Sequence, residues 1–109
     1  MPPVTSERDW KVFRELRELA LERLCQRALR DARVVVEDSS KSHHERFRDL
    51  FALVADRDEV IARGFDGPKR SEMLHQLALI HSLGLLEIHE LARFSEDTRE
   101  RVVSLARLF

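Results

Sequence analysis

One long stretch without helix-breaking residues constrains this sequence more than any other feature. No Gly or Pro lies between Arg8 and Asp38, and Ser6 is a suitable N-cap for a helix that runs to Val36. Apolar residues recur at helical spacing along one face of it. They are Trp10, Phe13, Ala20, Leu21, Leu24, Ala28, Ala32 and Val35. Some thirty helical residues span roughly 45 Å, whereas a domain of about one hundred residues has a radius of gyration near 13 Å. We therefore expect this helix to be longer than the body against which it packs.

The remaining sequence predicts four shorter helices. Ser42 and Glu45 form a capping box for a second helix, over about His43–Arg63, which should end at Gly64. Its expected apolar face consists of Phe47, Leu50, Phe51, Val54 and Ile61. The other helices are expected over about residues 68–83, 85–93 and 96–108. With three Gly and three Pro, the chain lacks the turn residues of a β fold. We predict one all-α domain over residues 1–109: a long antiparallel helical hairpin with a smaller three-helix C-terminal part packed on it.

The turn between the first two helices sets which residues should face each other. Residues 36 and 43 flank this turn, so the numbers of facing residues should add up to about 79. This register pairs Asp31 with Arg48 and places Asp58 within reach of Arg17. A buried charge without a partner is expensive. We therefore predict two structural ion pairs inside the hairpin, Arg17–Asp58 and Asp31–Arg48.

A second apolar row lies on another face of the first helix. It is formed by Val12, Leu16 and Leu19. The length of the helix and this spare row predict that a second copy of the chain covers it, which makes the protein a homodimer. The alternatives are that another helix of the same chain covers the row, or that the first helix bends.

Few residues have a spacing that indicates catalysis or metal binding. Glu72 and His75 have the Glu-x-x-His spacing of carboxylate-bridged di-iron bundles, but those bundles use the motif twice. No Gly-rich phosphate loop and no local triad signature are present. Cys25 has apolar helical neighbours, which is typical of an inert, packed thiol. We predict no enzymatic activity, no cofactor and no metal, and a metal site around Glu72 and His75 is the third hypothesis.

A stripe of arginines on the back of the first helix is the basis of the second hypothesis. Arg23, Arg27 and Arg30 have the spacing to follow a phosphate backbone. The alternative is a solvated face that suits the negative end of the helix dipole. Glu22 and Asp31 interrupt the stripe, and a net charge of −1 gives no overall attraction to nucleic acid. A nucleic-acid-associated regulator is therefore less well supported than a protein that binds protein.

Composition adds an expected location. No run reaches the 18 or so apolar residues of a membrane span, and a single cysteine excludes an internal disulfide, as suits a reducing cytoplasm. The 16 Arg against three Lys indicate a GC-rich, bacterial genome. The leading hypothesis is a non-enzymatic, cytoplasmic bacterial protein that acts by binding protein, as a homodimer or with an unknown partner, and without a membrane.

Overall fold

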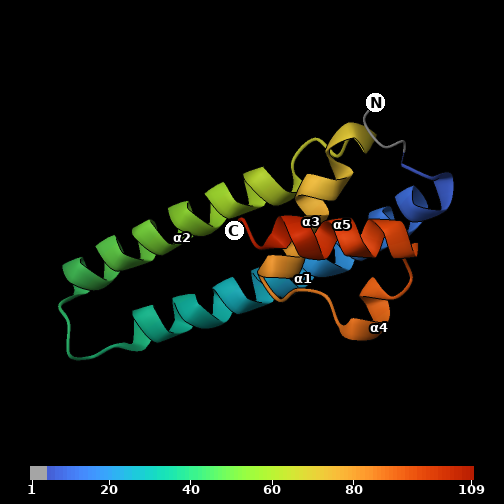
Figure 1. Cartoon of the computed structure of the whole chain (residues 1–109). Helices are drawn as coiled ribbons and strands as arrows, with labels where there is room; N and C mark the ends of the chain where they lie inside the picture. The colour runs from blue at the N-terminus through green and yellow to red at the C-terminus, as the bar shows by residue number, and fades with distance from the viewer. Residues whose placement is uncertain (1–4) are drawn as a thin grey trace.

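The computed structural model describes residues 5–109, and every regular element in that range is helical. Helices α1 (Glu7–Glu37) and α2 (His43–Phe65) form a long antiparallel hairpin (Figure 1). A 3-10 turn, η1 (Arg70–Glu72), leads into α3 (Met73–Ser82). A single helical turn, α4 (Ile88–Leu91), and a last helix, α5 (Glu96–Ala106), complete the C-terminal part. The predicted all-α fold, with a long hairpin and a smaller C-terminal part, is confirmed.

The starts of the two long helices follow their predicted caps. The backbone N–H of Asp9 donates to Ser6 Oγ at 3.1 Å. In the capping box of α2, the N–H of Glu45 donates to Ser42 Oγ at 3.1 Å, and the N–H of Ser42 donates to Glu45 Oε1 at 3.2 Å. Because each cap is local, sequence alone was sufficient to place both helix starts.

Helix ends and short helices differ from the prediction. Helix α2 continues through Gly64, where an added Cβ would lie 3.3 Å from Leu79 Cδ2 of α3. Gly64 therefore allows close packing of α2 on α3 and does not end the helix. The turn falls at Gly67, which has a φ of 54°, and Gly84 ends α3 with a φ of 69°. The expected helix from Pro68 is replaced by η1 and a later start of α3 at Met73.

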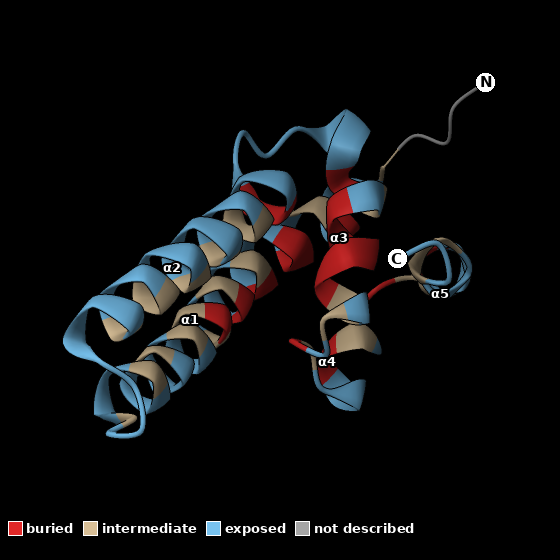
Figure 2. Cartoon of the chain, turned by 90° about the vertical axis from the view of Figure 1, so that its left-hand side faces the viewer, coloured by how far each residue is buried: buried red, intermediate tan, exposed pale blue. Residues whose placement is uncertain are grey.

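The hydrophobic core lies where α3, α5 and the first half of α1 meet (Figure 2). Its large, almost fully buried members are Phe13, Leu16, Phe65, Met73, Leu77, Ile80, Leu85, Phe94 and Val102. The second half of α1 and most of α2 project from this body. The molecule accordingly measures 54 × 26 × 22 Å, with a radius of gyration of 16.6 Å, against about 13 Å for a compact domain of similar length.

Asp9 connects the start of α1 to the start of α5. Its buried carboxylate accepts the Ser95 N–H at 3.0 Å on Oδ1, and the Ser95 and Thr98 hydroxyls at 2.7 Å each on Oδ2. Burial acts to raise the pKa of Asp9, but the hydrogen bonds from Thr98 and Ser95 outweigh it, so the pKa lies below its ordinary value. The carboxylate is therefore held ionised, and it ties together two helices that are far apart in sequence.

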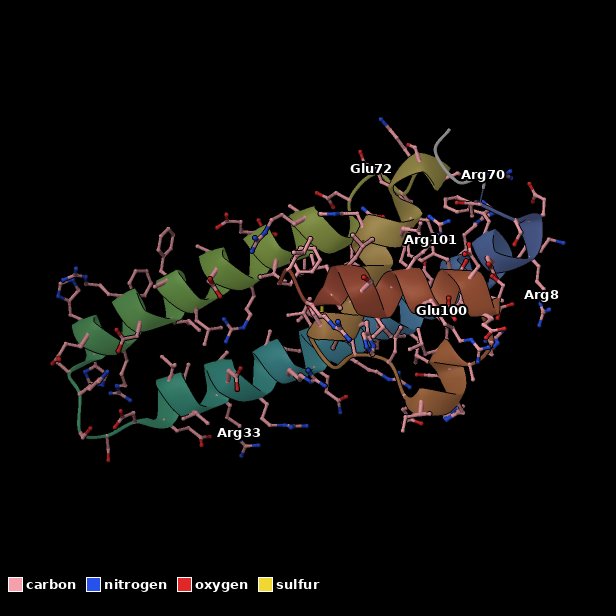
Figure 3. The ribbon with its side chains drawn as sticks, in the orientation of Figure 1. Arg8, Arg33, Arg70, Glu72, Glu100 and Arg101 are labelled. Atoms are coloured by element: carbon pink, nitrogen blue, oxygen red, sulfur yellow. The ribbon has the colours of Figure 1, made fainter. Side chains whose placement is uncertain are left out.

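We expect Asp9→Ala to lower the free energy of unfolding by about 2–4 kcal/mol, because the buried Thr98 hydroxyl and the two part-buried donors of Ser95 lose their acceptor. Urea denaturation followed by circular dichroism measures this loss. The matched control is Glu100→Ala, since Glu100 is an exposed carboxylate of α5 (Figure 3), and its change should stay within about 0.5 kcal/mol. Equal unfolding midpoints for the two variants would show that the Asp9 bridge does not stabilise the fold.

Candidate interaction surface

Arginine side chains hold the two ends of the hairpin. Arg17 of α1 donates to the carbonyl oxygen of Phe65, the last residue of α2. Arg46 of α2 donates to the carbonyl oxygen of Val36, near the end of α1, at 2.8 Å. The last carbonyls of a helix lack donors within the helix and carry the negative end of its dipole. Each helix of the hairpin therefore caps the C-terminal end of the other.

The two predicted ion pairs of the hairpin were wrong. Arg17 binds the Phe65 carbonyl, and Asp58 is exposed. Asp31 pairs with Arg57 at 3.3 Å, and Arg48 is exposed. Arg17 was expected to bind a charged side chain, but its acceptor is a backbone carbonyl at the end of α2.

The rotation of α2 explains both errors. The side of α2 that packs on α1 carries the half-buried residues Arg46, Leu53, Arg57 and Val60. Of the predicted face, Leu50 and Ile61 are half-buried, whereas Phe47, Phe51 and Val54 are exposed. Packing at the body end fixes this rotation, because the two last residues of α2 are buried there.

The arginine stripe of α1 is largely engaged inside the protein. Arg23 donates to both carboxylate oxygens of Glu90, from Nη1 to Oε1 at 2.6 Å and from Nη2 to Oε2 at 3.0 Å. Its Nη1 also donates to the Leu85 carbonyl at 2.9 Å. Arg27 donates to two carbonyls of the loop after α3, those of Leu83 and Gly84, at 2.7 Å each. Only Arg30 stays exposed without such a contact in the described chain. The donors of Arg23 and Arg27 hold the α3–α4 loop on α1, which leaves fewer of them free for the phosphate contacts predicted from sequence.

The predicted dimer row is mostly covered by the chain itself. Val12 and Leu16 are 8% and 3% exposed and belong to the core, whereas Leu19 is 40% exposed. The alternative that the same chain covers this row is what the structure shows. Val12, Leu16 and Leu19 therefore do not form a free apolar surface for a second copy.

Glu72 and His75 lie near the junction of η1 and α3. Glu72, like Arg70, projects from the η1 turn (Figure 3). His75 packs edge-to-face on Phe109, with ring centroids 5.2 Å apart. Within residues 5–109, no cluster of three His, Cys, Asp or Glu side chains is arranged to hold a metal ion. A carboxylate and an imidazole alone do not make up a closed set of metal ligands.

The large uncovered apolar surface lies on the projecting half of the hairpin. Along the described chain, no residue between Cys25 and Arg63 is buried. Figure 2 shows this half in the colours of exposed and intermediate residues, in contrast to the buried part of α3. Exposed large apolar residues gather here. We call five of them the hairpin face: Leu29, Val36, Phe47, Phe51 and Val54.

These five residues lie on one side of the hairpin. Leu29 and Val36 are two turns apart on α1, and the other three have the i, i+4, i+7 spacing of a single stripe on α2. Val36 and Phe47 line the same shallow hollow of about 200 Å³, which joins the two stripes. Leu29, Phe47 and Phe51 are 73%, 69% and 71% exposed. Sequence periodicity had identified the α2 stripe, but it predicted that this stripe packs on α1.

The opposite side of the hairpin is charged. Asp31, two residues from Leu29, pairs with Arg57, and Asp49, two residues from Phe47, pairs with Lys41 at 2.8 Å. Residues two apart point away from each other on a helix. The reverse side of the hairpin is therefore charged, whereas the hairpin face is mainly apolar and carries one ion pair at its α1 edge, Arg33–Glu37 at 3.0 Å.

A second apolar hollow lies between α4 and α5. It has a volume of about 570 Å³ and is open to solvent. Ile88, Leu91 and Val103 form its apolar wall, and Arg99 and Glu100 lie at its edge. The short α4, which was predicted as a longer helix, leaves Ile88 outside the core.

No protein family, curated protein or solved structure matches this chain. Within residues 5–109, none of the helices combines the length and the apolar character needed to cross a lipid bilayer.

Removing Arg23 should destabilise the fold far more than removing Arg30. Arg23→Ala leaves Glu90, which is 6% exposed, without its partner, and a hydrogen-bonded charge of this kind contributes about 1.5–3 kcal/mol. Arg30→Ala removes an exposed charge and should change the free energy of unfolding by less than about 0.5 kcal/mol. Urea denaturation compares the two, and similar losses for both would contradict the structural role of Arg23.

Stability should fall at acidic pH because of Glu90 and Asp9. Hydrogen bonds from Arg23 lower the pKa of Glu90 from 4.5, and those from Thr98 and Ser95 outweigh burial and lower that of Asp9 from 3.8. A carboxyl whose pKa is lower in the folded state stabilises the fold above its unfolded pKa, and this contribution is lost as the pH falls through the folded pKa. Urea midpoints between about pH 7 and pH 3 should show this loss.

The control for this pH dependence is Glu90→Gln, which does not titrate. This variant should be less stable at neutral pH and should lose less stability than the native chain on acidification. If both chains lose the same free energy over that range, the Glu90 carboxylate is not linked to folding.

Proposed function

We propose that this chain acts without enzymatic chemistry, by binding a protein through the hairpin face. One observation carries the proposal: a two-helix arm extends from a well-packed body, and its large apolar residues have no cover. Exposed apolar patches of this kind mark interaction sites in proteins that are otherwise well packed. Full burial of a Leu or Phe side chain contributes about 1.5–3 kcal/mol each. Covering Leu29, Phe47 and Phe51 therefore supplies a driving force for association, reduced by the entropy of bringing two chains together.

The chemistry of the arm favours a protein over other partners. The hollow beside Val36 holds about 200 Å³, which is less than the roughly 300–1,000 Å³ of small-molecule pockets. A helix that lies on an acidic membrane carries Lys and Arg on its polar side. Helix α2 instead has Asp49, Asp56 and Glu59 away from the hairpin face. A flat apolar surface whose reverse side carries paired charges of both signs, Asp31 with Arg57 and Asp49 with Lys41, suits the side of another helical protein.

The proposed location follows from composition. We propose a bacterial cytoplasm as the location, where the free Cys25 would stay reduced. Nucleic-acid binding remains a weaker candidate, because two arginines of the stripe already donate to Glu90 and to loop carbonyls.

Site-specific photo-crosslinking in the source organism tests the proposed function. A benzophenone amino acid in place of Phe51 should give crosslinked protein products on illumination, because this position would lie inside an interface. The matched control carries the same group in place of Ile88, a similarly apolar residue that is 92% exposed on α4. Crosslinking restricted to position 51 supports the proposal. No crosslinking at 51, or equal crosslinking at both positions, would overturn it.

A further inference from the structure

We infer that the partner of the hairpin face is a second copy of this chain, bound face to face with its hairpin antiparallel to the first. This inference rests on the proposed function, since it uses the same surface. It differs from the dimer predicted from sequence, because Val12 and Leu16 are buried in the core. The symmetry axis would lie in the interface, perpendicular to the helices, at the level of Phe51.

The register of the hairpin determines where along the two helices the symmetry axis lies. Arg46 of α2 contacts the carbonyl of Val36 in α1, so five residues further along α2, Phe51 lies level with Asp31 or Ala32. Counted from Ala32, Leu29 lies three residues before that level along α1 and Val36 lies four residues after it. A two-fold axis there brings α1 against α1 and α2 against α2, each antiparallel, and places Leu29 against Val36 of the second copy.

The side of α2 that carries Phe47 and Phe51 is complementary to itself about this axis. The pairing sets Phe51 against Phe51 of the second copy. It sets Phe47 against Ala55 of the second copy, so a large side chain meets a small one, as in interdigitating helix packing. At the ends, His44 lies against Asp58 of the second copy, a contact that allows a hydrogen bond or an ion pair. All five of these residues are exposed.

The area of the hairpin face reaches the lower limit for a dimer. In the projecting half, α1 contributes 12 helical residues and α2 contributes 20, which extend about 18 and 30 Å, and helices about 10 Å wide give roughly 480 Å² per copy. Two such faces bury close to the roughly 1,000 Å² expected of a specific interface.

The body does not obstruct this arrangement. Arg27, two residues from Leu29, contacts the loop after α3, so the body packs behind the hairpin face. With antiparallel hairpins, the two bodies lie at opposite ends of the assembly. Figure 1 shows that the tip of the hairpin is remote from α3, α4 and α5.

Light scattering after size-exclusion chromatography of the purified full chain tests whether two copies associate. The protomer has a mass of 12.8 kDa, and we expect twice this mass. Phe51→Asp should halve the measured mass and keep the helical circular dichroism of the native chain, whereas the control Ile88→Asp should stay dimeric. A monomeric native chain, or a Phe51→Asp variant that remains dimeric and folded, would overturn the inference.

Disulfide trapping tests the antiparallel register. In a Cys25→Ala background, Phe51→Cys should oxidise to a covalent dimer, because the two thiols lie at the axis. Phe47→Cys should not, since the two residues would be about 12 Å apart along the helices, beyond the roughly 7 Å that a disulfide spans. Efficient trapping at 47 and none at 51 would exclude this register. Photo-crosslinks in cells to another protein only, with a monomeric purified chain, would keep the proposed function and reject the second copy.

Discussion

Contacts between arginine side chains and the C-terminal carbonyls of neighbouring helices hold the elements of this fold in register. Arg17 and Arg46 do so at the two ends of the hairpin, and Arg27 does so at the end of α3. A guanidinium has five donors in a rigid fork, and the carbonyls at a helix end carry a partial negative charge. These arginines therefore need no carboxylate partner. Without Arg17 and Arg46, α2 and α1 would each end with a carbonyl that no protein donor reaches. Without Arg27, α1 would lose its hydrogen bonds to the loop that leads to α4.

Packing at one end of α2 determines the surface at its other end. Gly64 lets α2 approach Leu79 closely, and Phe65 enters the core beside it. A helix that is fixed in rotation at its last turn is fixed along its whole length, because each residue advances the same angle. Phe47 and Phe51 consequently point away from α1, although they are large apolar residues. The apolar surface of the arm is thus a consequence of core packing at the opposite end of α2.

Sequence reasoning succeeded where the determining interactions are local. Ser6 and Ser42 identify the starts of α1 and α2, since a cap needs only the next three residues. The side of α2 that faces α1 was not predictable in the same way. Apolar residues extend around more than half of α2, so the periodicity allows two rotations, and a distant contact at Gly64 selects one. Asp9 is similar: it resembles an ordinary acidic residue of a first helical turn, and its role depends on Ser95, which only the folded chain brings near.

The continuity of α1 makes the arm a preformed binding surface. The costly step of helix formation is nucleation, and the half of α1 inside the body supplies a nucleus on which the projecting half extends. Helix α2 is anchored in the core by Phe65 and joined to α1 at the far end by Arg46. A partner that covers Phe47 and Phe51 therefore meets helices that are already ordered. Association then avoids the entropy loss of folding a disordered segment, so more of the apolar burial remains as affinity.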